Sequence, residues 1–179
     1  MGTNQLRNQV LLMGLLGLTT LAAQAQICQQ EKPRPTDHKR FVVRSPDTVV
    51  DKQEKLEWQR CPIGLSGPVC QQGKLQRLTV MQAWEFAQRL HLDGAVEHKG
   101  WRLPTIDELA SLRKADCVDP AIDLTLFPNV QGDWYWSSSH EPQSTLDYWY
   151  FDFKAGVAGQ DDKSLANPVR LVRAVDNSL

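Results

Sequence analysis

A nine-residue segment, residues 101–109 (WRLPTIDEL), constrains the fold of this chain more than any other. Pro104 disfavours the helical region for Leu103, so the residues before it are expected to be extended. Thr105 stands three residues before Glu108, and this spacing predicts a capping box, in which each side chain bonds to the other residue's backbone amide. The segment therefore predicts a strand that stops at Pro104 and a helix that starts directly after Thr105.

Residues 1–25 have the pattern of a secretory signal peptide. Arg7 is followed by an apolar run over residues 10–18, and small residues precede a cleavage point before Gln26. The apolar run is too short and too interrupted for a membrane span, so we expect an exported mature chain without one. A lipid anchor on Cys28 is an alternative, but the residues before it are not the small ones that lipoprotein processing prefers.

Charge and length limit the function classes. The chain has 20 basic and 21 acidic residues, and the signal segment removes one basic residue, which leaves a mature net charge of −2. This balance argues against a nucleic-acid partner and against a polybasic membrane contact. About 150 mature residues suit one domain with a sizeable core. We therefore divide the chain into a signal peptide (1–25), an N-terminal tether (26–40) and a single domain (41–179).

All four cysteines, Cys28, Cys61, Cys70 and Cys117, lie in the exported part, where disulfides are the default. Three pairings are possible. Cys61 and Cys70 flank a turn-rich loop that brings its two ends together, so we pair these two and, by remainder, Cys28 with Cys117. No Cys-x-x-Cys pair is present, which argues against a zinc site.

Short β-prone runs predict a small antiparallel sheet: residues 41–43, 48–50 and 56–60. In the last of these, Leu56 and Trp58 are expected to face the core. A closing run at 169–175 predicts a final strand, and strands at the two ends of a chain commonly pair.

Two helices are predicted in the middle of the chain. The first covers about residues 80–90 and begins with a second capping box, Thr79 with Gln82. Its Trp84 is expected to pack in the core, as an aromatic residue on an apolar stripe usually does. The stripe contains Val80, Trp84, Ala87 and His91, widened by Met81, Ala83 and Leu90. The second helix, after Thr105, is expected to bury Ile106, Leu109, Ala110 and Leu112 or Arg113 and to end near Lys114.

Two further strands are predicted at residues 134–139 and 147–153. In the second strand, Trp149, Phe151 and Phe153 alternate with Tyr148, Tyr150 and Asp152, so the first set is expected in the core and the second on the opposite face. Residues 119–128 and 159–163 are expected to be loops. Antiparallel strands with two grouped helices are typical of an α+β fold.

The order of these motifs resembles the C-terminal domain family of bacterial collagen-like adhesins, over residues 28–175. The resemblance implies a C-type-lectin-like α+β domain with short antiparallel sheets, two helices and long loops, and it supports the disulfide pairing chosen above. The motifs that carry it are, in chain order, Cys28, segments 50–52 and 58–61, Cys70, WRLPTIDELASL (101–112), Cys117 with residues 119–123, WYWSSS (134–139), WYFDF (149–153) and VRLVR (169–173).

What the resemblance implies about function is limited. Most members of that family have no known function, and the best-studied ones bind sulphated polysaccharides, for which a net charge of −2 provides no broad basic field. No collagen-like repeat is present, so the oligomeric state stays open. The central motif and the closing VRLVR segment also resemble the formylglycine-generating enzyme. Its oxidase members use a late cysteine pair, whereas no cysteine follows Cys117 here, which counts against that activity.

The central motif itself, with Trp101, Arg102, Pro104, Thr105 and Glu108, is interpreted as structural, because Glu108 already caps the helix. The four histidines, His38, His91, His98 and His140, have neither metal-ligand spacing nor a recognisable triad partner. We therefore expect no catalytic residue, no metal and no cofactor. Calcium is an alternative, because residues 141–143 (Glu-Pro-Gln) resemble the Glu-Pro-Asn triplet of calcium-binding lectins and an acidic pair follows at residues 161–162.

Ligand binding is expected around residues 137–163. Exposed tyrosine rings stack on the apolar faces of sugars, and nearby polar side chains form hydrogen bonds with the hydroxyls. The predicted contacts are Ser137, Ser139, Tyr148, Tyr150, Asp161 and Asp162. The alternative is that both tyrosines are ordinary sheet residues and that the serines form a structural turn.

The sequence thus predicts an exported, non-catalytic binding module in the periplasm, on the cell surface or secreted. It would recognise a glycan or a host or envelope protein, as an adhesin does. A structural accessory of a pilus or envelope assembly is the second hypothesis, and a formylglycine-generating oxidase is the third.

Overall fold

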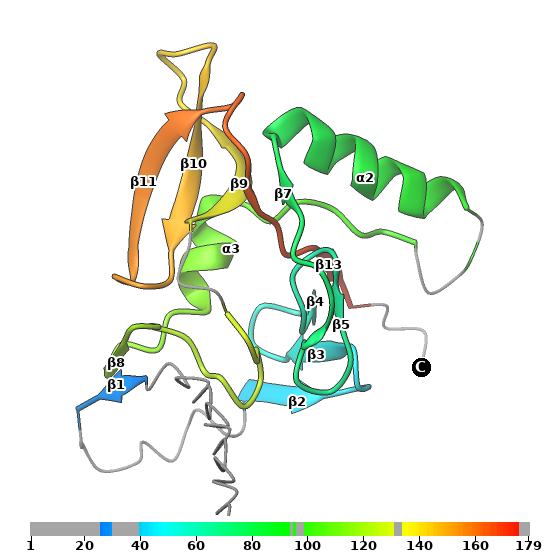
Figure 1. Cartoon of the computed structure of the whole chain (residues 1–179), viewed down its shortest axis with the longest axis vertical. Coiled ribbons are helices and arrows are strands. Elements are labelled where there is room, and N and C mark those ends of the chain that lie inside the picture. Colours follow the sequence, from blue (N-terminus) through cyan, green and yellow to red (C-terminus); the bar gives the residue numbers. More distant parts are fainter. Residues whose placement is uncertain (1–25, 30–39, 94, 96–98, 131–133, 176–179) are drawn as a thin grey trace, which may run out of the picture.

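The computed structural model describes residues 26–29, 40–93, 95, 99–130 and 134–175 (Figure 1). The predicted signal peptide, most of the predicted tether, His38 and His98 lie outside these residues. The described part is a mixed α+β fold with two helices and several short antiparallel sheets, and it contains no closed barrel. None of its helices is long and apolar enough to cross a membrane.

One antiparallel sheet joins the two ends of the domain, as predicted. In spatial order it contains β13 (Val172–Ala174), β4 (Leu56–Gln59), β3 (Thr48–Asp51) and β2 (Phe41–Val43). Leu56 and Trp58 are buried, as expected. Glu57 between them is also buried, with 2% of its surface exposed, because the arginines of two other segments, Arg44 and Arg173, neutralise its carboxylate.

A second antiparallel sheet has the order β11-β10-β9 and contains β9 (Trp134–His140), β10 (Asp147–Asp152) and β11 (Val157–Asp162). Residues 159–163, expected to be a polar loop, therefore lie mostly in a strand. The cause is the tight turn before it, where Gly156 has a positive φ of +74° and its amide donates to the Asp152 carbonyl at 2.7 Å. The turn directs the polar residues into an edge strand, where their side chains stay accessible.

Each helix begins with the capping box predicted for it. Helix α2 (Val80–Leu92) is capped by Thr79 and Gln82, and α3 (Ile106–Ser111) by Thr105 and Glu108. Helix α3 covers the face of the second sheet that carries Tyr135 and Phe151, and its Leu109 is buried there. It ends three residues before Lys114.

The prediction for the buried stripe of α2 is wrong at three positions. Trp84 is 44% exposed, and Met81 and His91 are also exposed. The buried residues are Val80, Ala83 and Ala87, with Phe86 and Leu90 packed partly against them. The true stripe is rotated toward the 83–87–90 side of the helix, and Trp84 lies at its edge.

Both predicted disulfides are present, Cys28–Cys117 and Cys61–Cys70. The first lies in a two-stranded ladder of β1 (Ile27–Cys28) and β8 (Cys117–Val118), so residues 26–29 pack on the domain and do not extend away from it as a tether. The second closes the loop of residues 61–70, which contains β5 (Leu65–Ser66); β5 pairs with β6 (Gln72–Gly73), which follows Cys70.

The closing segment 169–175, predicted as one strand, is a strand only over residues 172–174, in β13. A separate strand precedes it, β12 (Asn167–Pro168), which pairs with β7 (Arg77–Leu78). The residues between β12 and β13 are fully buried and run between the second sheet and α2 (Figure 1). Val169 and Leu171 belong to the core cluster under α2, whereas Val172 belongs to the cluster under α3.

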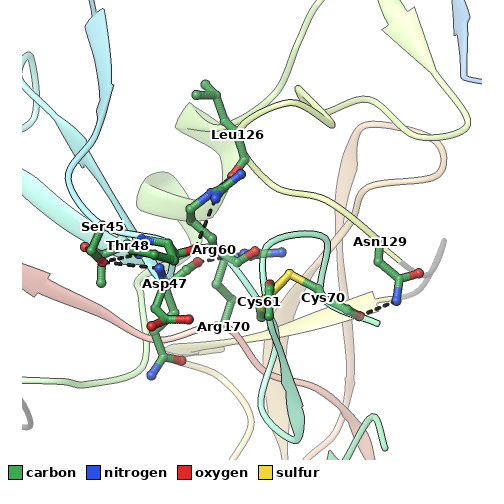
Figure 2. Close-up of a disulfide and its surroundings, with 12 residues drawn as sticks. Ser45, Asp47, Thr48, Arg60, Cys61, Cys70, Leu126, Asn129 and Arg170 are labelled. Carbon is green, nitrogen blue, oxygen red and sulfur yellow. Dashed lines mark hydrogen bonds between the residues drawn. A yellow bond between two sulfur atoms is a disulfide. The ribbon is translucent and has the colours of Figure 1, made fainter. Parts of the chain in front are cut away.

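Arg170 lies within that buried segment and is completely buried. Its guanidinium donates hydrogen bonds to the carbonyls of Gln59 and Arg60, beside the Cys61–Cys70 disulfide (Figure 2). The same guanidinium lies 4.8 Å from the centroid of the Phe127 ring. Burial lowers the pKa of Arg170 to about 10, which still leaves it protonated at neutral pH. The closing segment is thereby fixed to the strand that precedes the disulfide loop.

Candidate functional site

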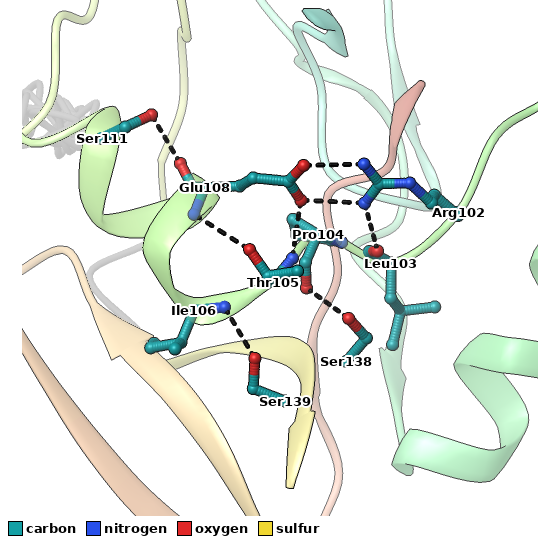
Figure 3. Close-up of polar contacts among 9 residues, drawn as sticks. All are labelled: Arg102, Leu103, Pro104, Thr105, Ile106, Glu108, Ser111, Ser138 and Ser139. Atoms are coloured by element: carbon teal, nitrogen blue, oxygen red, sulfur yellow. Dashed lines mark hydrogen bonds and ion pairs between the residues drawn. The ribbon is translucent and has the colours of Figure 1, made fainter. Parts of the chain in front are cut away.

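The central motif forms a closed hydrogen-bond network. Arg102 donates to both carboxylate oxygens of Glu108, at 2.8 and 2.7 Å, while Glu108 also accepts from the Thr105 amide at 2.7 Å (Figure 3). Burial raises the pKa of Glu108, but the Arg102 hydrogen bond, the Thr105 hydrogen bonds and the Arg102 charge outweigh it, so the pKa lies below the ordinary 4.5. With its charge neutralised inside the network, Glu108 acts as a helix cap.

The three serines of the WYWSSS segment are part of the same construction. Ser137 is fully buried, and its hydroxyl donates to the Trp149 carbonyl at 2.7 Å. Ser139 accepts from the amide of Ile106 at 3.1 Å, at the start of α3, and Ser138 donates to the Pro104 carbonyl (Figure 3). Ser137 therefore has no accessible surface to offer a ligand, and the Ser139 hydroxyl is engaged in positioning the helix.

The two tyrosines lie on the face of the second sheet that α3 does not cover. Tyr150 stacks on Trp134, with ring centroids 4.5 Å apart and planes within 11°, and Trp134 is 42% exposed. Tyr148 lies farther along the same face, with its ring centroid 6.1 Å from that of His140. Because alternate residues of a strand share a face, Asp152 and Asp161 belong to this surface too. We call it the aromatic face and define it by Trp134, Tyr148, Tyr150, Asp152 and Asp161.

Trp134 is the residue of this face that the sequence analysis did not single out. Its signal was the Trp-Tyr-Trp spacing, in which Trp134 and Trp136 must lie on one face. Trp136 is buried in the core cluster under α2, whereas Trp134, two residues earlier on the same face of β9, is partly exposed. Alternation identifies the face but not the point along it at which the core ends.

The two adjacent aspartates do not act together. In the β10–β11 register Asp161 is opposite Tyr148, whereas Asp162 is opposite Asp147 and so projects from the other side of the sheet. Asp162 accepts from the Ser164 amide at 2.8 Å, and this bond lowers its pKa. The two carboxylates therefore cannot chelate one calcium ion jointly, and the described residues contain no group of three or more potential metal-binding side chains. Glu141, of the Glu-Pro-Gln segment compared above with calcium-binding lectins, accepts a hydrogen bond from the side-chain amide of Gln160 at 2.6 Å.

A separate groove of about 690 Å³ runs between α2 and the extended residues before Pro104. Its exposed lining surface is mainly apolar and includes Trp84, Leu92 and Trp101, and the polar lining residues are Gln88, His91, Arg102 and Ser138. Leu92 is 80% exposed. Trp84, which the sequence predicted to be in the core, is therefore exposed to solvent in this groove.

A smaller, polar hollow of about 490 Å³ lies on the other side of Trp101. Glu57 is at its base and accepts from Arg173 at 2.9 Å and from Arg44 at 3.2 Å. Burial raises the pKa of Glu57, but its hydrogen bonds with Arg173 and Thr48 and the charges of Arg173 and Arg44 outweigh it, and the net shift is downward. In this hollow the carboxylate of Glu57 is paired with the guanidinium groups of Arg44 and Arg173, which is the arrangement of a structural ion network.

Most of the described chain matches one protein family. The family described as the Lcl C-terminal domain matches residues 47–173. The chain belongs to the Lcl C-terminal domain family. The match includes both capped helices, the whole second sheet with its aromatic face, and the first sheet apart from β2, which confirms the resemblance of this Lcl C-terminal domain found in the sequence. No curated protein matches the chain significantly.

Proposed function

We propose that this Lcl C-terminal domain is an exported, non-catalytic binding module that recognises a glycan through the aromatic face. The observation that carries the proposal is the Trp134–Tyr150 stack, a broad aromatic surface that is part exposed and held rigid by the sheet. An indole ring fixed in this way offers a flat apolar surface to a sugar ring at little entropic cost. Asp152 and Asp161 beside it supply hydrogen-bond acceptors for hydroxyl groups.

Three further parts of the proposal concern fold and location. The α+β architecture supports a C-type-lectin-like domain, and the two disulfides are compatible with an oxidising compartment. Export would depend on residues 1–25 acting as the signal peptide. All four cysteines are paired in these disulfides, which leaves no reduced cysteine for an oxidase of the formylglycine-generating kind.

The test compares two tryptophans of similar exposure on different surfaces, Trp134 and Trp84. The Trp134→Ala variant of the exported chain is expected to lose at least about tenfold in glycan affinity on an array or in calorimetry, since truncated aromatic anchors usually cost that much. Trp84→Ala is the matched control and should bind as the unaltered chain does. Equal glycan binding by Trp134→Ala and the unaltered chain would refute the proposal.

A second candidate function, an accessory of an envelope or pilus assembly, is favoured by the groove beside α2. Trp84 and Leu92 give that groove an exposed apolar surface suited to a protein partner. Under this hypothesis Trp84→Ala would lose an envelope partner in co-purification and Trp134→Ala would keep it. The same pair of variants thus distinguishes the two functions.

A further inference from the structure

The aromatic face carries a net negative charge. The strand register places on it, in three neighbouring rows, Trp134 with Asp152 and Val157, Trp136 with Tyr150 and Gly159, and His140 with Tyr148 and Asp161. These described residues include two carboxylates and no lysine or arginine.

The two carboxylates flank the stacked rings. Asp152 pairs directly with Trp134 across the strands, and Asp161 follows Gly159 by two residues on β11, so one carboxylate lies on each side of the Tyr150 row. Burial raises the pKa of the Tyr150 phenol, and the negative charges of Asp161 and Asp152 raise it further. Both carboxylates are therefore close enough to the stack to act on a group bound there.

The two lysines that adjoin β11 and β10 in the sequence, Lys163 and Lys154, lie outside the three rows. Lys163 donates its ammonium to the Thr145 carbonyl at 2.8 Å, beyond the end of β11. Lys154 lies in the turn between β10 and β11, outside the three rows. The Asp152 carboxylate accepts a hydrogen bond from the backbone amide of Lys154 at 2.7 Å, and the Asp161 carboxylate accepts one from the backbone amide of Asp162 at 3.0 Å. These bonds hold the two carboxylates in place but do not cancel their charge.

From this arrangement we infer that the ligand of the aromatic face is an amino sugar polymer with free amines, whose rings stack on Trp134 while their ammonium groups meet Asp152 and Asp161. The inference rests on the proposed function, because it names the glycan class for that same face. An ammonium group is complementary to two carboxylates and to an aromatic surface, whereas a sulphate would be repelled by both carboxylates. The face therefore selects against sulphated glycans.

The experiment uses two oligosaccharides with the same sugar backbone, the pentamer of glucosamine, which carries free amines, and the pentamer of N-acetylglucosamine, in which each amine is a neutral acetamide, with heparin as a polyanion. We expect the full exported chain to bind the amine pentamer about three- to tenfold more tightly than the acetylated one at 50 mM salt, and this preference should shrink at 500 mM. Asp161→Asn keeps the oxygen that accepts from Asp162 but removes the charge, and it should reduce the preference about threefold. Asp107→Asn removes one charge from an exposed position on α3 and is the matched control.

The outcomes distinguish failure of the amino-sugar inference from failure of the proposed glycan binding. Equal binding of both pentamers, tighter binding of the acetylated pentamer or of heparin, or an Asp161→Asn preference unchanged from that of Asp107→Asn would overturn the amino-sugar inference and leave glycan binding standing. No binding of any of the three glycans would overturn both. A salt-sensitive preference for the amine pentamer that Trp134→Ala abolishes would support both.

Discussion

Gly159 is the residue on which the shape of the aromatic face depends. A Cβ placed there would lie 2.4 Å from the Tyr150 hydroxyl oxygen and 2.5 Å from the ring carbon that carries it. Its backbone is outside the left-handed region, so conformational freedom does not explain the glycine. The missing side chain instead makes room for the Tyr150 ring, which crosses the edge strand at this point.

We predict that Gly159→Ala displaces the Tyr150 ring and disturbs its stack with Trp134. Overpacking of this kind costs about 1–3 kcal/mol of unfolding free energy, measurable by urea denaturation, and it should weaken glycan binding as well. In a Tyr150→Ala background the added methyl group meets no ring and should cost nearly nothing. If the cost of Gly159→Ala is the same in both backgrounds, the glycine has another role.

At this scale the sequence was informative wherever a residue's partner is near it in the chain. The Thr105–Glu108 pair is such a case, and the structure confirms it. Glu57 is the opposite case: alternation in its strand predicted an outward side chain, but Arg173, 116 residues away, makes its burial possible. Trp84 and Trp134 were misjudged or missed for the same reason, since the extent of the core along a helix or strand is set by distant segments.

At the scale of single elements, α3 is a short helix stabilised mostly at its N-terminus. Thr105 caps the amide of Glu108 at 3.2 Å, Ser139 of β9 accepts from Ile106, and Arg102 fixes the capping carboxylate. Short helices are marginal by themselves, so these bonds and the burial of Leu109 hold the helix on the sheet. Ser139 therefore connects the face of the sheet covered by α3 to the helix start.

The stability of this cap is expected to depend on pH. The folded pKa of Glu108 lies below the ordinary 4.5, so its contribution is present above about pH 4.5 and is lost as the pH falls through the lower folded value. Glu57, also shifted downward, should add to the same acid-side loss. We predict that Glu108→Gln destabilises the domain in urea at pH 7 and that the difference from the unaltered chain narrows near pH 3. A difference that stays constant down to pH 3 would contradict the assignment.

Elements with local signals were predictable from the sequence and elements without them were not. The two capping boxes, the paired N-terminal runs and the strand at 134–139 all have such signals, and all are found. Strand β11 was expected to be a loop because its residues are polar, yet the turn at Gly156 aligns it with β10. The closing segment was expected to be one strand over residues 169–175, but its ladder covers only residues 172–174, and the carbonyls of Val169 and Leu171 accept from the amides of Ile63 and Gln59 outside that ladder.

At the scale of the whole molecule, the two disulfides stabilise the domain to different extents. Cys28–Cys117 closes a sequence separation of 89 residues, and Cys61–Cys70 one of 9. In the chain-entropy account the longer loop contributes about 4.5 kcal/mol and the shorter about 3 kcal/mol. We predict that replacing Cys28 and Cys117 by alanine lowers the unfolding free energy more than replacing Cys61 and Cys70, as measured by urea denaturation of both double variants. The reverse order would show that native packing around the short loop outweighs chain entropy.

The overall α+β class and the cysteine pairing could be predicted from the sequence, whereas the composition of the aromatic face could be predicted only in part. Tyr148, Tyr150 and Asp161 do lie together, because period-two alternation is robust. Ser137 and Asp162 do not join them: one is buried and the other projects from the opposite side. Those two positions depend on register and depth, which no short stretch of sequence encodes.

The Cys28–Cys117 bridge also determines how the domain would respond to mechanical load. A pull between the start of the described chain and its end is carried covalently from Cys28 to Cys117, so the residues between them, including both helices, are shielded from the force. Extension under load would then be shorter by roughly 300 Å than for the reduced chain. Tension would fall on the part of the chain from β8 to β13, which contains the whole of the sheet that carries the aromatic face.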